Sequence, residues 1–185
     1  MVAWIIAAVI VVLFLLFIIG IYNTLIRLRN QVDNSWSQID VQLKRRHDLI
    51  PNLVETAKGY MTHERGTFEA ITNARSQAMG AKSVAEAAKA EGAIGQALSK
   101  FLLVVENYPD LKANQNFLAL QEELTSTENK ISFSRQSYND QVLFFNNKIQ
   151  MFPSNIIAAV LNFTKRDFFE LEDVAERQVP KVNFT

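Results

Sequence analysis

The sequence predicts an all-α protein, in which an N-terminal transmembrane helix continues into an elongated antiparallel four-helix bundle. Three observations support this fold class. Residues 2–21 contain twenty consecutive positions without a charged side chain. Apolar residues recur at intervals of three and four in one later stretch and at intervals of seven in another, which is the spacing of a helical seam. The alternating apolar and polar pattern of half-buried strands is absent.

The first expected element is a membrane anchor over residues 1–22. A helix of about 20 residues spans about 30 Å, the thickness of the hydrocarbon core of a bilayer. A cleaved signal peptide is disfavoured, because no Lys or Arg precedes the run and no small-residue cleavage pattern follows it. The residues expected to face lipid include Trp4, Ile5, Val11, Phe14, Phe17 and Ile21.

Basic residues next to the span predict its orientation. Arg27 and Arg29 follow the apolar run closely, and no basic residue precedes it. Because Lys and Arg concentrate on the cytosolic side of membrane spans, the N-terminus is expected outside and the domain in the cytosol. The predicted location is the cell (inner) membrane, crossed once.

Residues 23–163 are expected to form the helical bundle domain, and residues 164–185 a C-terminal tail. The first helix should pass through Pro51 without ending, because its heptad register is the same on both sides of the proline. The second helix is expected over about 63–79 with Thr62 as N-cap, the third over about 84–106 behind a capping box at Ser83 and Glu86, and the fourth over about 110–151.

Two seams define the long helices. On the first helix the seam runs through Val32, Trp36, Ile39, Leu43, Arg46, Ile50, Leu53, Ala57 and Tyr60. On the fourth it runs through Phe117, Leu124, Ile131, Tyr138, Phe145 and Phe152, each seven residues after the last. This spacing is that of a coiled coil.

The helix lengths favour an up-down-up-down topology, in which the fourth helix returns to the membrane. A rival topology runs the second and third helices in one direction and leaves the tail at the far end. In the favoured topology, residues near 156 lie close to residues near 25. The short apolar stretch 154–163 then either caps the bundle or lies in the membrane interface, and capping is the favoured alternative.

Arg46 is the one charged member of the first seam, so a carboxylate partner is expected for it. If the first and fourth helices are antiparallel, Arg46 lies near Glu128 and Trp36 lies near Arg135. These four residues form the predicted polar network of the bundle core. Such pairs fix the register of helices and are weak evidence for catalysis.

The sequence predicts no catalytic, cofactor-binding or metal-binding residues. There is no cysteine, and neither His47 nor His63 belongs to a metal-binding motif. Nucleotide-binding glycine patterns and nucleophile motifs are missing. Nineteen basic residues balance nineteen acidic ones, which argues against binding to nucleic acid.

At these residues the chain resembles the LemA family of bacterial membrane proteins. The resemblance covers nearly the whole chain and includes Tyr22-Asn23, residues 36–60 (WSQIDVQLKRRHDLIPNLVETAKGY), His63-Glu64, residues 106–113 (ENYPDLKA), residues 117–124 (FLALQEEL), Glu128, Arg135, Tyr138-Asn139, Asn146 and Phe152-Pro153. It implies a single-pass anchor, a mostly helical bundle and no established enzymatic activity. It also implies that members accompany other membrane proteins, including proteases.

The function expected from sequence is that of a non-enzymatic, membrane-anchored scaffold that associates with itself. Its expected partners are the lipid bilayer, further copies of the chain and a membrane protein such as a protease. The alternative is an adaptor or regulator of a membrane protease or another envelope complex. An enzyme is the third hypothesis, and a concave pocket with perturbed titratable groups would favour it.

Overall fold

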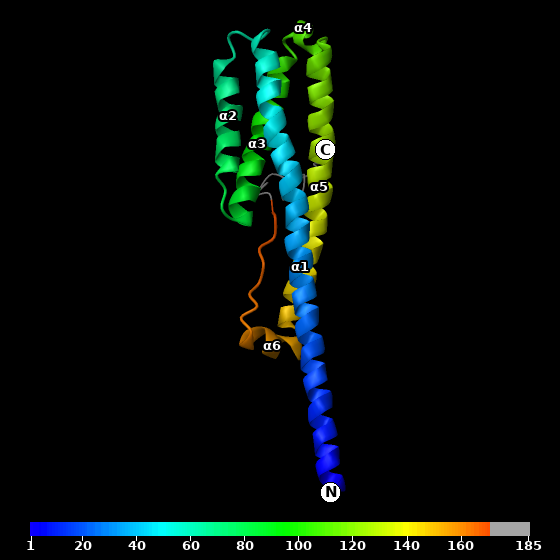
Figure 1. Cartoon of the computed structure of the whole chain (residues 1–185). Helices are drawn as coiled ribbons and strands as arrows, with labels where there is room; N and C mark the ends of the chain where they lie inside the picture. The colour runs from blue at the N-terminus through cyan, green and yellow to red at the C-terminus, as the bar shows by residue number, and fades with distance from the viewer. Residues whose placement is uncertain (171–185) are drawn as a thin grey trace, which may run out of the picture. The chain divides into compact units, whose positions relative to one another are not determined.

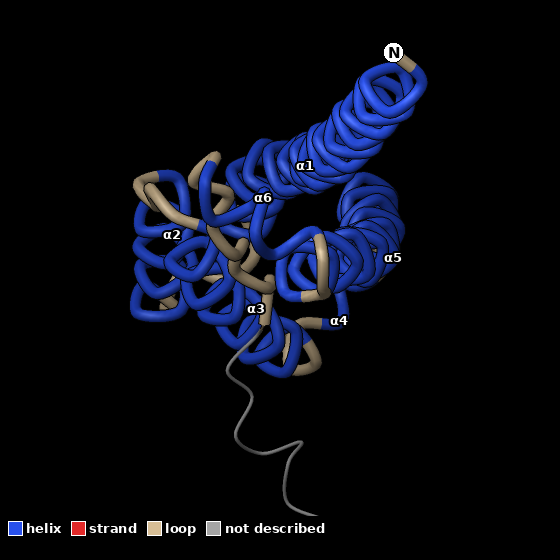
Figure 2. The backbone as a smooth tube through the Cα atoms, turned by 90° about the horizontal axis from the view of Figure 1, so that it is seen from below, coloured by secondary structure: helices blue, strands red, loops and turns tan. Residues whose placement is uncertain are grey.

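The computed structural model describes residues 1–170, and all regular structure in that range is helical (Figures 1 and 2). The helices are α1 (Val2–Lys58), α2 (Arg65–Met79), α3 (Val84–Val105), α4 (Pro109–Lys112), α5 (Gln115–Gln150) and α6 (Ser154–Val160). Most of the predicted tail, from residue 171 on, lies outside the described residues.

The chain divides into two compact units, and α1 and α5 each contribute to both. Unit 1 contains Met1–Asp40 and Phe133–Asp167, and unit 2 contains Val41–Ser132 and the chain from Phe168 on. The apolar start of α1 belongs to unit 1. It is long and apolar enough to cross a membrane, and its side chains are not buried by protein.

The interior of unit 1 is built from α1 and α5. The buried apolar side chains are Ile21, Leu25, Val32 and Ile39 of α1 and Tyr138, Val142, Phe145 and Ile149 of α5. Trp36 packs on Tyr138 with ring centroids 5.6 Å apart. The seam residues of both helices therefore point inward here, as the heptad spacing predicts.

The segment that follows α6 lies beside the end of the apolar span. The ring of Phe163 lies 6.5 Å from Tyr22 and 6.4 Å from Phe145, and the Arg29 guanidinium lies 5.7 Å from the same ring. Residues just after α6 therefore contact α1 near residue 25, as the up-down-up-down topology requires. A tail at the far end from the span does not fit these contacts.

Two polar side chains of α5 hold the backbone after α6. The Asn146 amide donates to the carbonyl of Arg166 and accepts from its N–H, both at 2.9 Å. The Tyr138 hydroxyl donates to the carbonyl of Asp167 at 2.9 Å. Burial raises the pKa of Tyr138, so the hydroxyl stays protonated and available as this donor.

The core of unit 2 contains residues from five helices. Three phenylalanines form its centre, with centroid distances of 6.3 Å from Phe68 to Phe101 and from Phe101 to Phe117. Around them lie Ile50, Leu53, Val54, Ala57, Met61, Ile71, Ala74, Ala78, Ile94, Ala97, Val105 and Leu111. Arg46 contacts Glu128, and Asn114 donates to the Tyr60 hydroxyl. Tyr60 lies just after α1 and Asn114 just before α5, so the partner numbers fall on one segment as they rise on the other, and the two segments are antiparallel within unit 2.

The predicted helix ends are partly right. The Ser83 hydroxyl accepts from the N–H of Glu86, and the Glu86 carboxylate accepts from the N–H of Lys82, so the predicted cap of α3 is confirmed. Thr62 as the N-cap of α2 is wrong, because Glu64 occupies that position. Residues 60 and 61 close a turn on the Ala57 carbonyl and bury Met61, which delays the start of α2.

The fourth predicted helix is divided in the structure. The short α4 ends at Lys112, and α5 begins at Gln115. Asn114 separates them, because its side-chain oxygen accepts from the N–H of Phe117 at 3.0 Å and so caps α5. Both seams are otherwise buried or half-buried. The last residue of each seam is the exception, because Tyr60 is 40% and Phe152 80% exposed.

Candidate functional site

Arg46 is the centre of a charged cluster inside unit 2. It is 2% exposed, and its two terminal nitrogens contact the carboxylates of Glu91 on α3 and Glu128 on α5. A buried cation requires such partners, because transfer of an unpaired charge from water into an apolar interior is costly. One side chain of α1 therefore connects three helices.

Glu91 is the buried carboxylate of this cluster. One of its oxygens contacts Arg46, and the other lies 2.6 Å from Nε2 of His47. Burial alone would raise the pKa of Glu91, but the hydrogen bond with His47 and the charge of Arg46 outweigh it, so the pKa lies below its usual value. The group is therefore a carboxylate at neutral pH.

Pro51 and Arg75 complete the surroundings of His47. Pro51 has no N–H, so the carbonyl four residues earlier in α1, that of His47, lacks its ordinary helical donor. The Arg75 Nε–H of α2 donates to this carbonyl at 2.7 Å. The proline therefore does not break α1, as its register predicts, and the carbonyl that it leaves free becomes a contact with α2.

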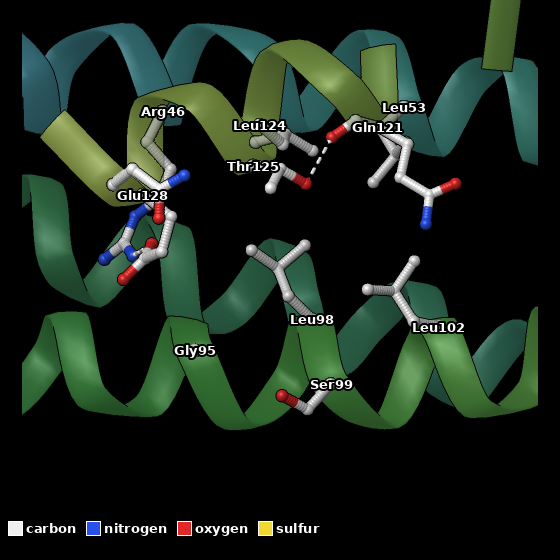
Figure 3. Close-up of a pocket in the computed structure, with 11 residues that line it drawn as sticks. Arg46, Leu53, Gly95, Leu98, Ser99, Leu102, Gln121, Leu124, Thr125 and Glu128 are labelled. Atoms are coloured by element: carbon white, nitrogen blue, oxygen red, sulfur yellow. Dashed lines mark hydrogen bonds and ion pairs between the residues drawn. The ribbon is translucent and has the colours of Figure 1, made fainter. Parts of the chain in front are cut away.

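A cleft lies beside the charged cluster, between α1, α3 and α5. Its volume is about 320 Å³. Figure 3 shows Arg46 and Glu128 at one end, with Leu98 and Leu102 of α3 facing Leu124 of α5. The other lining residues are Leu53, Gly95, Ser99, Gln121, Thr125 and Asn129. The walls are thus largely apolar and one end is charged.

The two carboxylates of the cluster differ in accessibility. Both oxygens of Glu91 are occupied by neighbouring side chains, which leaves neither free for a substrate. Glu128 is the accessible carboxylate of the cluster, with a side chain 54% exposed. Among residues 1–170, no three His, Asp or Glu side chains are grouped so that they could hold a metal ion.

The structure places the four residues of the predicted network in two groups. Arg46 and Glu128 are in contact within unit 2. Trp36 and the half-buried Arg135 belong to unit 1, where Trp36 packs on Tyr138. The predicted proximity of Trp36 to Arg135 stays a prediction.

The predicted anchor residues are exposed, with one exception. Trp4, Ile5, Val11, Phe14 and Phe17 are each more than half exposed, whereas Ile21 is 8% exposed. Ile21 is therefore part of the interior of unit 1, and the apolar face that protein leaves uncovered ends just before it. Arg27 is exposed, and Arg29 is half-buried above the Phe163 ring.

Comparison with known proteins identifies the family. The model of the LemA family matches residues 35–184, which includes both the charged cluster and the cleft. The chain belongs to the LemA family.

This LemA-family chain is similar to three relatives over most of its length. It is 29% identical to Protein LemA of Metamycoplasma hominis over 175 residues, which cover 88% of this chain and 78% of the relative. It is 23% identical to Magnetosome protein MamQ 2 of Paramagnetospirillum magneticum over 86% of this chain and 68% of the relative. Magnetosome protein MamQ of Magnetospirillum gryphiswaldense is 20% identical over 80% of this chain and 64% of the relative.

Sequence reasoning missed three members of the cluster, namely Glu91, His47 and Arg75. The sequence does contain a signal for Glu91, because this residue lies on the same helical face as Ala87, Ala88 and Ile94, all of which are buried. A charged residue on an apolar face predicts a buried partner. The signal at Arg75 is indirect, because it requires knowing that α2 packs against the carbonyl that Pro51 leaves free.

Proposed function

We propose that this LemA-family chain is a non-enzymatic, membrane-anchored helical scaffold that associates with itself. One observation carries the proposal. The single helix α1 carries an apolar span that protein leaves exposed, and it continues without a break to the buried Arg46. An anchor and a rigid domain are thus joined by continuous helix, which suits a protein that holds other components at a fixed place on a membrane.

The proposal includes the finer features expected from the sequence. The span crosses the inner membrane once, with the N-terminus outside and the helical domain in the cytosol, because Arg27 and Arg29 follow the span. The domain is an antiparallel four-helix bundle with coiled-coil seams along α1 and α5. Support comes from the contacts of Arg46 with Glu128 and of Asn114 with Tyr60.

Self-association is proposed to occur partly through the span. Ala3 and Ala7 lie four residues apart, so they share a face of α1 where the backbones of two helices could approach closely. The bulky side chains around them, including Trp4 and Phe14, are exposed in the single chain. Contact between spans would cover part of this surface with protein in place of lipid.

Native mass spectrometry of the full chain in mild detergent tests this proposal. The expected result is a homo-oligomer that the double substitution Ala3→Leu, Ala7→Leu weakens, while the matched pair Val2→Leu, Ile6→Leu on a neighbouring face does not. A monomer at the lowest energy that removes detergent would overturn self-association. An oligomer equally insensitive to both pairs would exclude the small-residue face as its contact.

The second candidate function is an adaptor or regulator of a membrane protease or another envelope complex. The observation that favours it is the cleft beside Arg46, whose leucine walls and accessible Glu128 carboxylate could receive a partner segment. A photo-crosslinking residue at Ser99, on the cleft wall, should then capture a membrane protein, and the same residue at Lys89, on an exposed part of α3, should not. Capture of a second copy of the chain would instead support the scaffold.

A further inference from the structure

The corner between α5 and α6 in unit 1 exposes an unusual amount of apolar surface. Phe152 is 80% and Val160 74% exposed, and Met151, Ile156 and Leu161 are also exposed. We call these five residues the corner patch. Single exposed apolar side chains are common on protein surfaces, but a group of large ones within eleven consecutive residues indicates a contact surface.

A helix at the surface of a soluble domain usually buries its large apolar residues. The helix α6 instead buries small residues and exposes large apolar ones. Its buried residues are the small Ser154 and Ala158, at 1% and 2% exposure. Two of its three large β-branched residues, Ile156 and Val160, are exposed, and Ile157 is half-buried. Because an amphipathic helix places its larger apolar residues in the more apolar surroundings, the surroundings expected outside α6 are apolar.

The corner patch is close to the end of the apolar span. Phe163, two residues after the patch, contacts Tyr22, the residue that follows the predicted span. Figure 1 shows α6 beside α1 at this level. All these residues belong to unit 1, so their proximity is a property of that unit alone. A bilayer crossed by residues 2–21 would have its surface next to α6.

Most charges near the patch are positive. Neither residues 1–32 nor residues 141–166 contain an Asp or a Glu. Asp33 and Asp167 directly follow these two stretches, and Asp33 pairs with Arg166 at 3.0 Å. The basic residues in these two stretches are Arg27, Arg29, Lys148, Lys165 and Arg166. Basic residues near a membrane surface are attracted to anionic headgroups by about 1 kcal/mol each. The end of unit 1 that carries the span thus combines apolar side chains with an excess of positive over negative charge.

We propose that the corner patch inserts into the interface of the bilayer that α1 crosses, so that each chain has a second membrane contact besides its span. Interfacial segments place their apolar face about 5–10 Å into the boundary between headgroups and acyl chains. Phe163 remains folded against Tyr22 and Phe145, so this one side chain caps the interior of unit 1 while the patch around it meets lipid.

A lipid surface fits the patch better than a second copy of the chain. The continuity with the span and the excess of basic over acidic residues both match an anionic bilayer. A symmetric contact between two such corners would bring five basic residues of each copy together, and like charges at an interface oppose association.

Depth measurement by spin labelling tests the proposal in the full chain. The chain contains no cysteine, so Phe152→Cys and Val160→Cys each give one labelled site. The labelled chain is reconstituted at low density in vesicles of phosphatidylcholine and phosphatidylglycerol. Collision rates of the label with oxygen, which partitions into lipid, and with a nickel chelate, which stays in water, then report its depth.

The matched control is Phe133→Cys, because Phe133 is 75% exposed and belongs to the same helix and the same unit. It precedes Gln150, the end of α5, by about 26 Å of helix. The expected ratio of oxygen to nickel collisions is several-fold higher at positions 152 and 160 than at 133. Equal ratios at the three positions would overturn the proposal.

Three further outcomes would each reject the proposal. Labels at 152 and 160 that collide with neither reagent would show that protein covers the patch, which also overturns the proposal. Because the inference rests on the proposed crossing of the bilayer by α1, Ile10→Cys is labelled in parallel. A lipid-type ratio at position 10 with water-type ratios at 152 and 160 would reject the corner contact and leave the anchor intact. A water-type ratio at position 10 would reject both.

Discussion

The interiors of the two units contain different kinds of polar contact. In unit 2 the interior between helices contains Arg46 and Glu91, two buried ionised groups that neutralise each other. In unit 1 the corresponding seam contains aromatic contacts, and the polar bonds are made from Asn146 and Tyr138 to backbone. Loss of a partner in unit 2 leaves a charge without water, whereas loss of a partner in unit 1 leaves groups that water can reach. Comparable substitutions should therefore lower the free energy of unfolding several-fold more in unit 2 than in unit 1.

The largest expected effect is that of Arg46→Ala. Removal of one member of a buried ion pair typically costs about 3–5 kcal/mol, because the remaining charge is uncompensated. Here Glu91 would keep only His47 as a partner. Chemical unfolding of the full chain in detergent, followed by circular dichroism, measures the loss.

The neighbouring Arg45→Ala is the matched control. Arg45 contacts Glu123, but its side chain is 49% exposed, and exposed pairs contribute about 0–1 kcal/mol. Equal losses for the two alanine variants would show that Arg46 is solvated and that the contrast between the units is wrong.

Glu91→Gln should give a penalty that depends on pH. The folded-state pKa of Glu91 lies below its value in the unfolded chain, so the unfolded state binds the extra proton first on acidification. The stabilisation by the carboxylate is therefore complete above the ordinary glutamate pKa of about 4.3, and it is lost as the pH falls through the folded value.

The difference in unfolding midpoint between the original chain and Glu91→Gln should accordingly be largest near pH 7 and should shrink on acidification below that range. Other carboxylates titrate in both proteins and largely cancel. A difference that is constant from pH 7 to pH 3 would mean that the pKa of Glu91 is the same in the folded and unfolded states, which would contradict the ion pair.

Arg46 and Glu91 also show which contacts could be predicted from the sequence and which could not. The Arg46–Glu128 contact was predicted from the regular heptad spacing of the two long helices together with an antiparallel arrangement. Glu91 lies on α3, whose alanine-rich start, with Gly92 and Gly95, fixes no such register. The pairing of α3 with α1 depends on the lengths of two turns, and spacing within one helix does not determine those.

Helix ends were predictable where a side chain makes the cap and not elsewhere. Ser83 and Asn114 both cap helices through their own side chains, and of the two only the Ser83 cap was predicted. The start of α2 has no side-chain cap at all. It is set by the burial of Met61, a tertiary effect that local sequence does not encode.

Arg75→Ala should have the second largest effect, about 1.5–3 kcal/mol, the range for a hydrogen bond to a charged donor. Its loss leaves the His47 carbonyl without a donor. The control is the same substitution in a Pro51→Ala background, where residue 51 regains its N–H and can bond this carbonyl within α1. The cost of Arg75→Ala should then fall to a fraction of its first value. An unchanged cost would show that Arg75 acts by some other contact.

Asn146→Ala tests the backbone contact of unit 1. It removes two hydrogen bonds to Arg166, and because Arg166 is exposed, water can replace both. The expected cost is about 1–2 kcal/mol, and it should be confined to the segment after α6. Trypsin cleavage after Lys165 and Arg166 should become about tenfold faster, as a change of about 1.4 kcal/mol in local opening predicts. The exposed neighbour Asn147→Ala should leave the rate unchanged, and equal acceleration in both variants would contradict the assignment.

The smallest expected effect is that of Asp33→Ala. Asp33 pairs with Arg166 at 3.0 Å, but the two side chains are 55% and 43% exposed. Such a pair contributes about 0–1 kcal/mol, and salt screens it. Asp40→Ala removes another exposed acidic residue from α1 and serves as the control. The difference between these two variants, measured by chemical unfolding, should be small at low salt and should vanish near 1 M salt. A loss that matches Arg46→Ala and persists in high salt would mean that this ion pair is desolvated, and the distinction between a charged interior in unit 2 and a water-accessible one in unit 1 would fail.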